Sequence, residues 1–153
     1  MPTPLHFNPS GRARRGVLAW LPRLAVFALG GTALGASAAD PLDVTLDFAR
    51  AEHSAGRVTL IDIREPEEHA TGVAAGAKLL PMRQLASRLG EVPNAADQPV
   101  LLICNTQNRS GATVRALRER GYTNVRFVQG GMSEWARRGW PMVKPGAAAQ
   151  PGG

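Results

Sequence analysis

The chain has 153 residues, of which 18 are Lys or Arg and 12 are Asp or Glu, giving a formal net charge of +6. Four of the arginines and none of the acidic residues fall in the first 39 positions, so the remainder is close to neutral and offers no basic domain for binding nucleic acid. A single cysteine excludes an internal disulfide.

The first 39 residues resemble an export signal. Three arginines between positions 12 and 15 form a basic start, residues 24–34 are apolar, and residues 36–39 are small. We predict a signal peptide and a periplasmic or secreted protein with no membrane attachment after cleavage. The apolar stretch is short of the roughly 20 residues that a membrane span needs, so an uncleaved anchor is the weaker alternative. Arg14-Arg15 also resembles a twin-arginine signal, but the general secretory route is favoured.

From residue 40 onward, short apolar runs alternate with helix-like segments. The run at 58–63 is β-branched and apolar, which is typical of a buried parallel strand. Pro66 among acidic residues marks a helix start. We expect a strand at 43–45, a helix at 46–54, a strand at 58–63, a helix near 66, a strand at 78–80 and a helix at 83–89 that ends at Gly90.

The second half continues the alternation. We expect a buried strand at 100–103, a helix at 110–120, a strand at 124–128, a helix at 132–138 and a disordered tail over 145–153. Strands that alternate with helices indicate the α/β class. The prediction is a single domain over 40–144, with a central, mostly parallel sheet of about five strands flanked by helices.

Cys104 follows the predicted buried strand at 100–103, and parallel sheets form their sites at the carboxyl ends of strands. If residues 105–109 curl, their backbone N–H groups point inward and form an anion-binding nest. The positive end of the following helix and the charge of Arg109 act in the same direction. These three features favour a reactive thiolate and an anionic substrate.

The remaining loop side chains are neutral. We expect Asn105, Thr106, Gln107 and Asn108 to bind substrate mainly through their backbone, together with Ser110. The alternatives are that Cys104 is a small buried hydrophobic residue and that Arg109 is an ordinary ion-pair partner.

Acidic and basic residues near the strand at 58–63 are assigned to structure. Asp62 and Arg64 are expected to pin neighbouring loops, and Glu65, Glu67 and Glu68 to compensate a helix dipole. No histidine adjoins Cys104, so a Cys–His hydrolase would need His53 or His69 to approach it in space. One cysteine and scattered histidines do not have the spacing of a metal site.

Three segments together resemble the single-domain rhodaneses, which are sulfurtransferases. Residues 59–68, TLIDIREPEE, are similar to the family's strand ending in Asp-x-Arg before an acidic helix start. Residues 104–109, CNTQNR, resemble its six-residue active loop, and residues 121–139 resemble its last strand, double glycine and Trp helix. The similarity spans about residues 43–143. One departure is Gly72–Ala77, where the family often has Gly-His-Ile-Pro-Gly-Ala.

The resemblance implies transfer of a sulfane sulfur, from a donor such as thiosulfate to cyanide or a thiol, through a persulfide on Cys104. It implies no cofactor and no metal, and allows a protein as sulfur acceptor. Related phosphatases on the same scaffold have a loop that is one residue longer, so the Cys-x4-Arg spacing favours sulfur transfer. The alternatives are a non-catalytic binding or sulfur-carrier module and, less favoured, a phosphatase or arsenate reductase.

Overall fold

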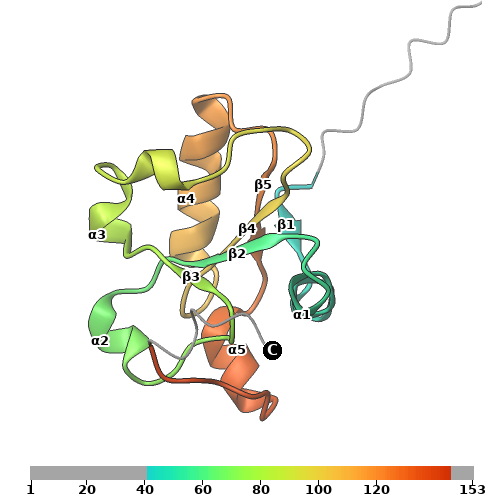
Figure 1. The fold of residues 1–153 in the computed structure, drawn as a ribbon, viewed down its shortest axis with the longest axis vertical. Coiled ribbons are helices and arrows are strands. Elements are labelled where there is room, and N and C mark those ends of the chain that lie inside the picture. Colours follow the sequence, from blue (N-terminus) through green and yellow to red (C-terminus); the bar gives the residue numbers. More distant parts are fainter. Residues whose placement is uncertain (1–40, 146–153) are drawn as a thin grey trace, which may run out of the picture. The chain divides into compact units, whose positions relative to one another are not determined.

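A computed structural model of the chain describes residues 41–145, so the predicted signal peptide and nearly all of the predicted tail lie outside the described residues. Five parallel strands form one sheet in the order β1-β5-β4-β2-β3 (Figure 1). The strands are β1 (Asp43–Val44), β2 (Thr59–Asp62), β3 (Lys78–Leu79), β4 (Val100–Ile103) and β5 (Val125–Val128). This confirms the predicted α/β class and the parallel five-stranded sheet.

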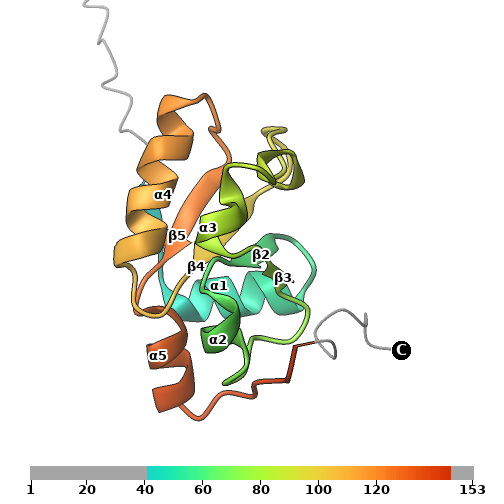
Figure 2. The same ribbon diagram turned by 90° about the vertical axis from the view of Figure 1, so that its left-hand side faces the viewer.

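Helices cover both faces of the sheet. In Figures 1 and 2, α3 and α4 lie on one side of it and α1 lies on the other. The helical elements are α1 (Leu46–Ser54), α2 (Pro66–His69), α3 (Met82–Leu85), the 3-10 turn η1 (Leu89–Glu91), α4 (Asn108–Glu119) and α5 (Gly131–Arg137). Thr45 caps α1, because its hydroxyl accepts a hydrogen bond from the Phe48 N–H at 3.2 Å.

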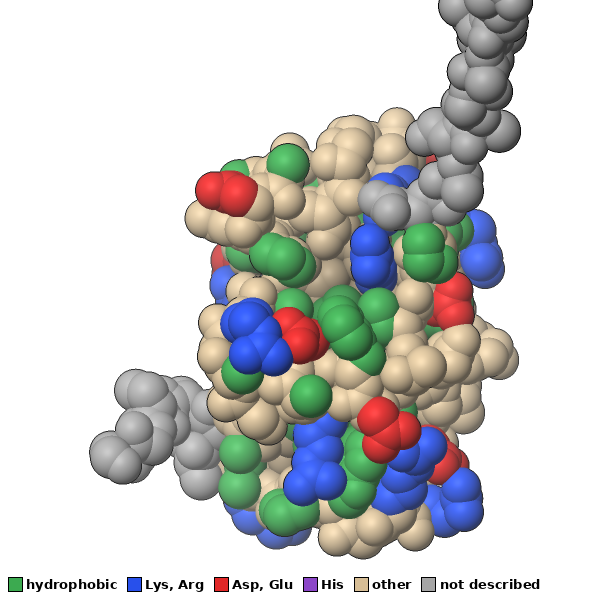
Figure 3. All heavy atoms as spheres, turned by 90° about the vertical axis from the view of Figure 1, so that its right-hand side faces the viewer, with side chains coloured by type: hydrophobic (Ala, Val, Ile, Leu, Met, Phe, Trp, Pro, Cys, Tyr) green, Lys and Arg blue, Asp and Glu red, His purple; other side chains and the backbone are tan. Residues whose placement is uncertain are grey.

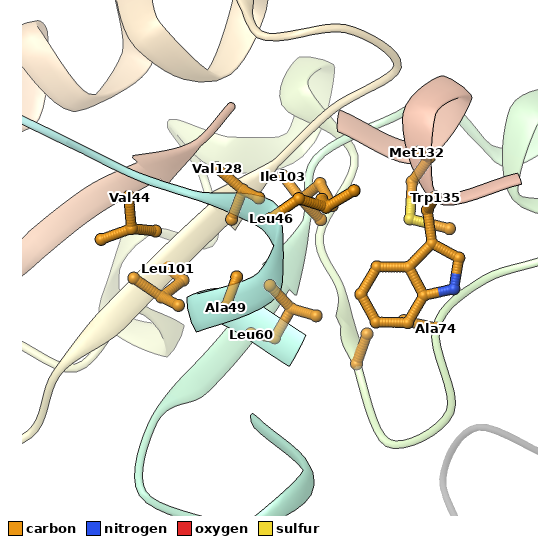
Figure 4. Packing of buried hydrophobic residues seen from close by; sticks show 11 residues of the cluster. Val44, Leu46, Ala49, Leu60, Ala74, Leu101, Ile103, Val128, Met132 and Trp135 are labelled. Carbon is orange, nitrogen blue, oxygen red and sulfur yellow. The ribbon is translucent and has the colours of Figure 1, made fainter. Parts of the chain in front are cut away.

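The sheet separates two hydrophobic cores, because successive side chains of a strand point to opposite faces. Leu101 and Ile103 of β4 join the core under α1 and α5, which also contains Trp135 (Figure 4). Leu102 and Cys104 belong to the core on the α4 side. All four residues of β4 are buried, as expected for the central strand of a parallel sheet.

Two predicted helices differ from the structure at their ends by more than one residue. The segment 83–89 is not one helix: α3 covers only Met82–Leu85, the backbone of Arg88 leaves the helical region, and Gly90 lies inside η1. Helix α4 begins at Asn108, two residues before the predicted start, because the Gly111 N–H already donates to the Gln107 carbonyl at 2.8 Å. With this start, the Ser110 N–H lies in the first turn of α4, 3.4 Å from Cys104 Sγ.

The surface beside α1 and α5 mixes aromatic and basic side chains. Trp140 meets Trp135 edge to face with 5.0 Å between ring centroids, and the Arg50 and Arg138 guanidinium carbons lie 4.5 and 5.1 Å from the Trp140 ring centroid. Figure 3 shows hydrophobic and basic side chains next to one another on the side of the molecule where α1 lies. None of the helices in residues 41–145 has the length and apolar character needed to cross a bilayer.

Candidate active site

Cys104 lies directly after β4, at the carboxyl edge of the sheet. Ile103 pairs with Asp62 of β2, so the ends of these two central strands lie side by side. The Cys104 side chain points to the α4 side and is only 1% exposed. The strand therefore places the sulfur beneath the start of α4.

The start of α4 surrounds the sulfur with hydrogen-bond donors. The Ser110 N–H donates to Cys104 Sγ at 3.4 Å, and the Ser110 Oγ lies 3.4 Å from the same atom. Within the described part of the chain, the N–H groups of residues 105–109 pair with no acceptor. Free N–H groups in a curled loop at a helix N-terminus are the arrangement that binds anions. Ser110, one of the predicted binding residues, is thus in direct contact with the sulfur.

The beginning of α5 holds the loop in place. The Met132 N–H donates to the Cys104 carbonyl and the Ser133 N–H to the Asn105 carbonyl, both at 2.8 Å. Two N–H groups at the start of α5 are satisfied in this way, and two loop carbonyls are held by α5. The Gln107 side chain adds a third link, because its Oε1 accepts from the Gly130 N–H at 3.1 Å. The expectation that Gln107 acts mainly through its backbone therefore misses this side-chain role.

Gly131 permits this contact between α5 and the loop. Its φ is +60°, and a Cβ at this position would lie 2.1 Å from the Thr106 carbonyl oxygen and 2.5 Å from that of Cys104. No other residue fits so close to a backbone. The double glycine is visible in the sequence as part of the segment that resembles the rhodaneses, but no local pattern indicates its contact with the loop.

Arg109 forms a two-pronged ion pair with Glu68 of α2. Its Nη1 donates to Glu68 Oε2 at 2.7 Å and its Nη2 to Oε1 at 2.5 Å, with the two side chains 31% and 32% exposed. The hydrogen bonds from Arg109 lower the pKa of Glu68 to about 2, and the carboxylate raises the pKa of Arg109. Glu68 was expected only to compensate a helix dipole. The structure adds a partner 41 residues away, and nothing in the local sequence signals it.

Asp62 and Arg64 form a second ion pair, which is buried. The Arg64 guanidinium donates to Asp62 Oδ2 at 2.7 Å and to the Gly72 carbonyl at 2.7 Å, and it reaches the Glu68 carbonyl at 3.3 Å. Both side chains are almost completely buried. The pair connects the end of β2 to α2 through the Glu68 carbonyl and to the turn after α2 through the Gly72 carbonyl.

The histidines have other neighbours. The His69 ring is buried with its Nε2 3.4 Å from Asp62 Oδ1, and the His53 Nε2 lies 2.7 Å from the Ala75 carbonyl oxygen. Within residues 41–145, Ser110 is the residue at hydrogen-bond distance from Cys104 Sγ, so no Cys–His pair forms there. The same residues contain no group of three or more His, Cys, Asp or Glu side chains that could hold a metal ion.

Comparison with known proteins agrees with this geometry. The model of the rhodanese-like domain family matches residues 45–138. A sulfurtransferase of Allochromatium vinosum is 39% identical over 88 residues, which cover 58% of this chain and 80% of that protein.

Among solved structures, the chain is similar to the human single-domain sulfurtransferase TSTD1, with 28% identity and a TM-score of 0.56 over 63% of this chain and 96% of that one. It is also similar to a rhodanese-related protein of Thermoplasma volcanium, with 29% identity and a TM-score of 0.57 over 66% of this chain and 96% of that one. These relatives support a sulfur-transfer function. With a family match over more than half its length, the chain belongs to the rhodanese-like family.

Proposed function

We propose that this protein is a sulfurtransferase that carries a sulfane sulfur as a persulfide on Cys104. The observation that carries the proposal is the cradle around Cys104 Sγ: the Ser110 N–H points at the sulfur from 3.4 Å, and the neighbouring loop N–H groups have no acceptor among the described residues. Such donors stabilise a negative charge on sulfur before, during and after the transfer. Relatives named as sulfurtransferases support the same chemistry.

The reaction is a covalent transfer in two steps. With thiosulfate as donor, the Cys104 thiolate attacks the outer sulfur, a new S–S bond forms, and the old S–S bond breaks with its electron pair leaving on sulfite. Cyanide or a thiolate then attacks the outer sulfur of the persulfide. The acceptor leaves as thiocyanate or a new persulfide, and the thiolate of Cys104 returns.

The proposed location of this activity is the periplasm or the extracellular space, following the export signal expected in the first 39 residues. The mass of the protein isolated from its native compartment tests this part, since it reports where the chain has been cut. Recovery of the uncut chain from the cytoplasm would contradict it.

The direct test is to treat the purified protein with thiosulfate, record its mass, add cyanide and measure thiocyanate. We expect the protein to gain the mass of one sulfur atom and to lose it when cyanide is added. Cys104→Ser, which keeps the size of the side chain, is expected to abolish both signals. A protein that gains no sulfur from any sulfane donor would falsify the proposal.

A sulfur carrier that hands its persulfide to a protein acceptor is the second candidate, and the burial of Cys104 favours it. Cys104 is 1% exposed, so a persulfide formed on it is shielded from loss to solutes in bulk water, as a carrier requires. A carrier would show a stable persulfide with very slow release to cyanide and small thiols. An enzyme acting on small acceptors would release the sulfur in many turnovers.

A further inference from the structure

We propose that Glu68, through its ion pair with Arg109, sets the donor preference of this site toward uncharged or singly charged persulfides and against the thiosulfate dianion. This inference rests on the proposed function, and it names the class of donor and the residue that selects it. Glu68 has no contact with Cys104 and acts through Arg109, so it is a positioning residue.

The charge inventory around the loop supports this selection. The four residues between Cys104 and Arg109 are neutral, so Arg109 brings the only full positive charge within the loop. Glu68 holds that charge at 2.7 and 2.5 Å through both terminal nitrogens. Cys104 and, to a smaller degree, Glu65 also act on Arg109 electrostatically. Glu65 is itself paired with Arg83 at 4.0 Å, so the carboxylate that offsets the guanidinium charge at the loop is that of Glu68.

Neighbouring cations do not replace the cancelled charge. Arg64 is held by the buried carboxylate of Asp62 at 2.7 Å. On the α5 side, Arg137 and Arg138 both contact Glu134, at 2.6 and 2.8 Å. What remains to attract an anion is the set of N–H dipoles at the start of α4, which is worth about half a unit charge.

This remaining attraction fits one class of donor better than another. Thiosulfate carries two negative charges and must approach a thiolate that is itself anionic. A persulfide, RSSH or RSS⁻, brings one charge or none, and its slim outer sulfur can reach a Cys104 that is 1% exposed. In the transfer from RSSH, Cys104 thiolate attacks the outer sulfur, the proton stays on that sulfur, and RS⁻ leaves with the electron pair.

The test compares thiosulfate with N-acetylcysteamine persulfide, whose only charge is on its sulfur, in wild type and Glu68→Gln. We expect wild type to prefer the persulfide in kcat/KM by about tenfold or more, the size of one partly screened unit charge. Glu68→Gln keeps the shape of the side chain and should raise kcat/KM for thiosulfate by about tenfold, mainly through a lower KM, with little change for the persulfide.

Two further variants separate charge from structure. Glu52→Gln removes one carboxylate from an exposed pair with Arg57 and should leave the donor ratio unchanged. In Glu68→Gln/Arg109→Gln the ratio should return toward the wild-type value, because Glu68 acts through Arg109. The thiosulfate reaction of Glu68→Gln should also slow with added salt more than that of wild type, since its Arg109 charge is no longer compensated.

The inference is overturned if wild type uses both donors equally well, or if Glu68→Gln lowers both by the same factor, which is the sign of a purely structural role. Should the variant not fold, the donor ratio of wild type decides alone. Failure of the proposed function looks different, because neither donor would then leave sulfur on Cys104.

Discussion

Two arginine–carboxylate pairs, Asp62–Arg64 and Glu68–Arg109, lie at opposite ends of the same short segment around α2. Both are close and multiply hydrogen-bonded, with shortest contacts of 2.7 and 2.5 Å. Asp62 and Arg64, the inner pair, are 0% and 4% exposed. Glu68 and Arg109, the outer pair, are each about one third exposed. The same chemical groups therefore operate in two different dielectric environments.

Burial decides what each pair can do. A buried charge must keep its partner, because leaving it alone in a low-dielectric interior is strongly unfavourable. A pair at the surface exchanges its partner for water or a ligand at little loss. Asp62–Arg64 thus stabilises the fold, whereas Glu68–Arg109 can change the net charge that a donor meets at the loop.

The largest effect is expected from breaking the inner pair. Arg64→Ala leaves Asp62 buried without its guanidinium partner and frees the Gly72 carbonyl, so it should lower the free energy of unfolding by about 3–5 kcal/mol. Urea denaturation followed by circular dichroism measures this. Arg57→Ala, which breaks the exposed pair with Glu52, is the control and should leave stability nearly unchanged. Equal losses in the two variants would remove the distinction based on burial.

A second variant moves the loop that presents the outer pair and leaves the inner pair intact. Gly131→Ala adds a Cβ that would lie 2.1 Å from the Thr106 carbonyl oxygen, at a backbone φ of +60°. The left-handed backbone alone costs about 1–2 kcal/mol, and the loop must also shift. We expect a moderate loss of stability and a near-complete loss of persulfide formation, recorded by mass. Gly139→Ala also has positive φ but open space around its Cβ, so it should keep the activity.

A smaller effect on stability is expected from the outer pair. Arg109→Gln should lower the free energy of unfolding by no more than about 1 kcal/mol, because both partners are partly solvated. The same variant should slow sulfur uptake from anionic donors, since the carboxylate of Glu68 then stands uncompensated at the loop. A stability loss as large as that of Arg64→Ala would mean that the outer pair is structural too.

The smallest effect concerns pH. Pairing with Arg109 holds the pKa of Glu68 at about 2, below its ordinary value of 4.5. The stabilisation is therefore complete above pH 4.5 and is lost as the pH falls toward 2. Solvent screening limits it to about 1 kcal/mol or less. The stability difference between wild type and Glu68→Gln should shrink across this window, and a difference that stays constant from pH 5 to pH 2 would contradict the assignment.

The sequence predicts the features of the site that are local in the chain but not the contacts between distant segments. A four-residue apolar strand, the cysteine after it and the arginine five positions on are all local, so the position of the loop and the fold class could be predicted and are confirmed by the sheet. The pairing of Glu68 with Arg109 and the contact between Gly131 and the loop join segments that lie far apart in the chain. Such contacts depend on how the elements pack, and no local pattern encodes them.

The hydrogen bonds from Met132 and Ser133 to the loop have a consequence for biosynthesis. A ribosome makes β4 and Cys104 well before it makes α5, so the thiol exists for a time without the amide groups that fix the shape of its loop. The loop thus reaches its final shape only when α5 docks on it. A chain truncated before α5 would lack the two hydrogen bonds from Met132 and Ser133 to the loop carbonyls.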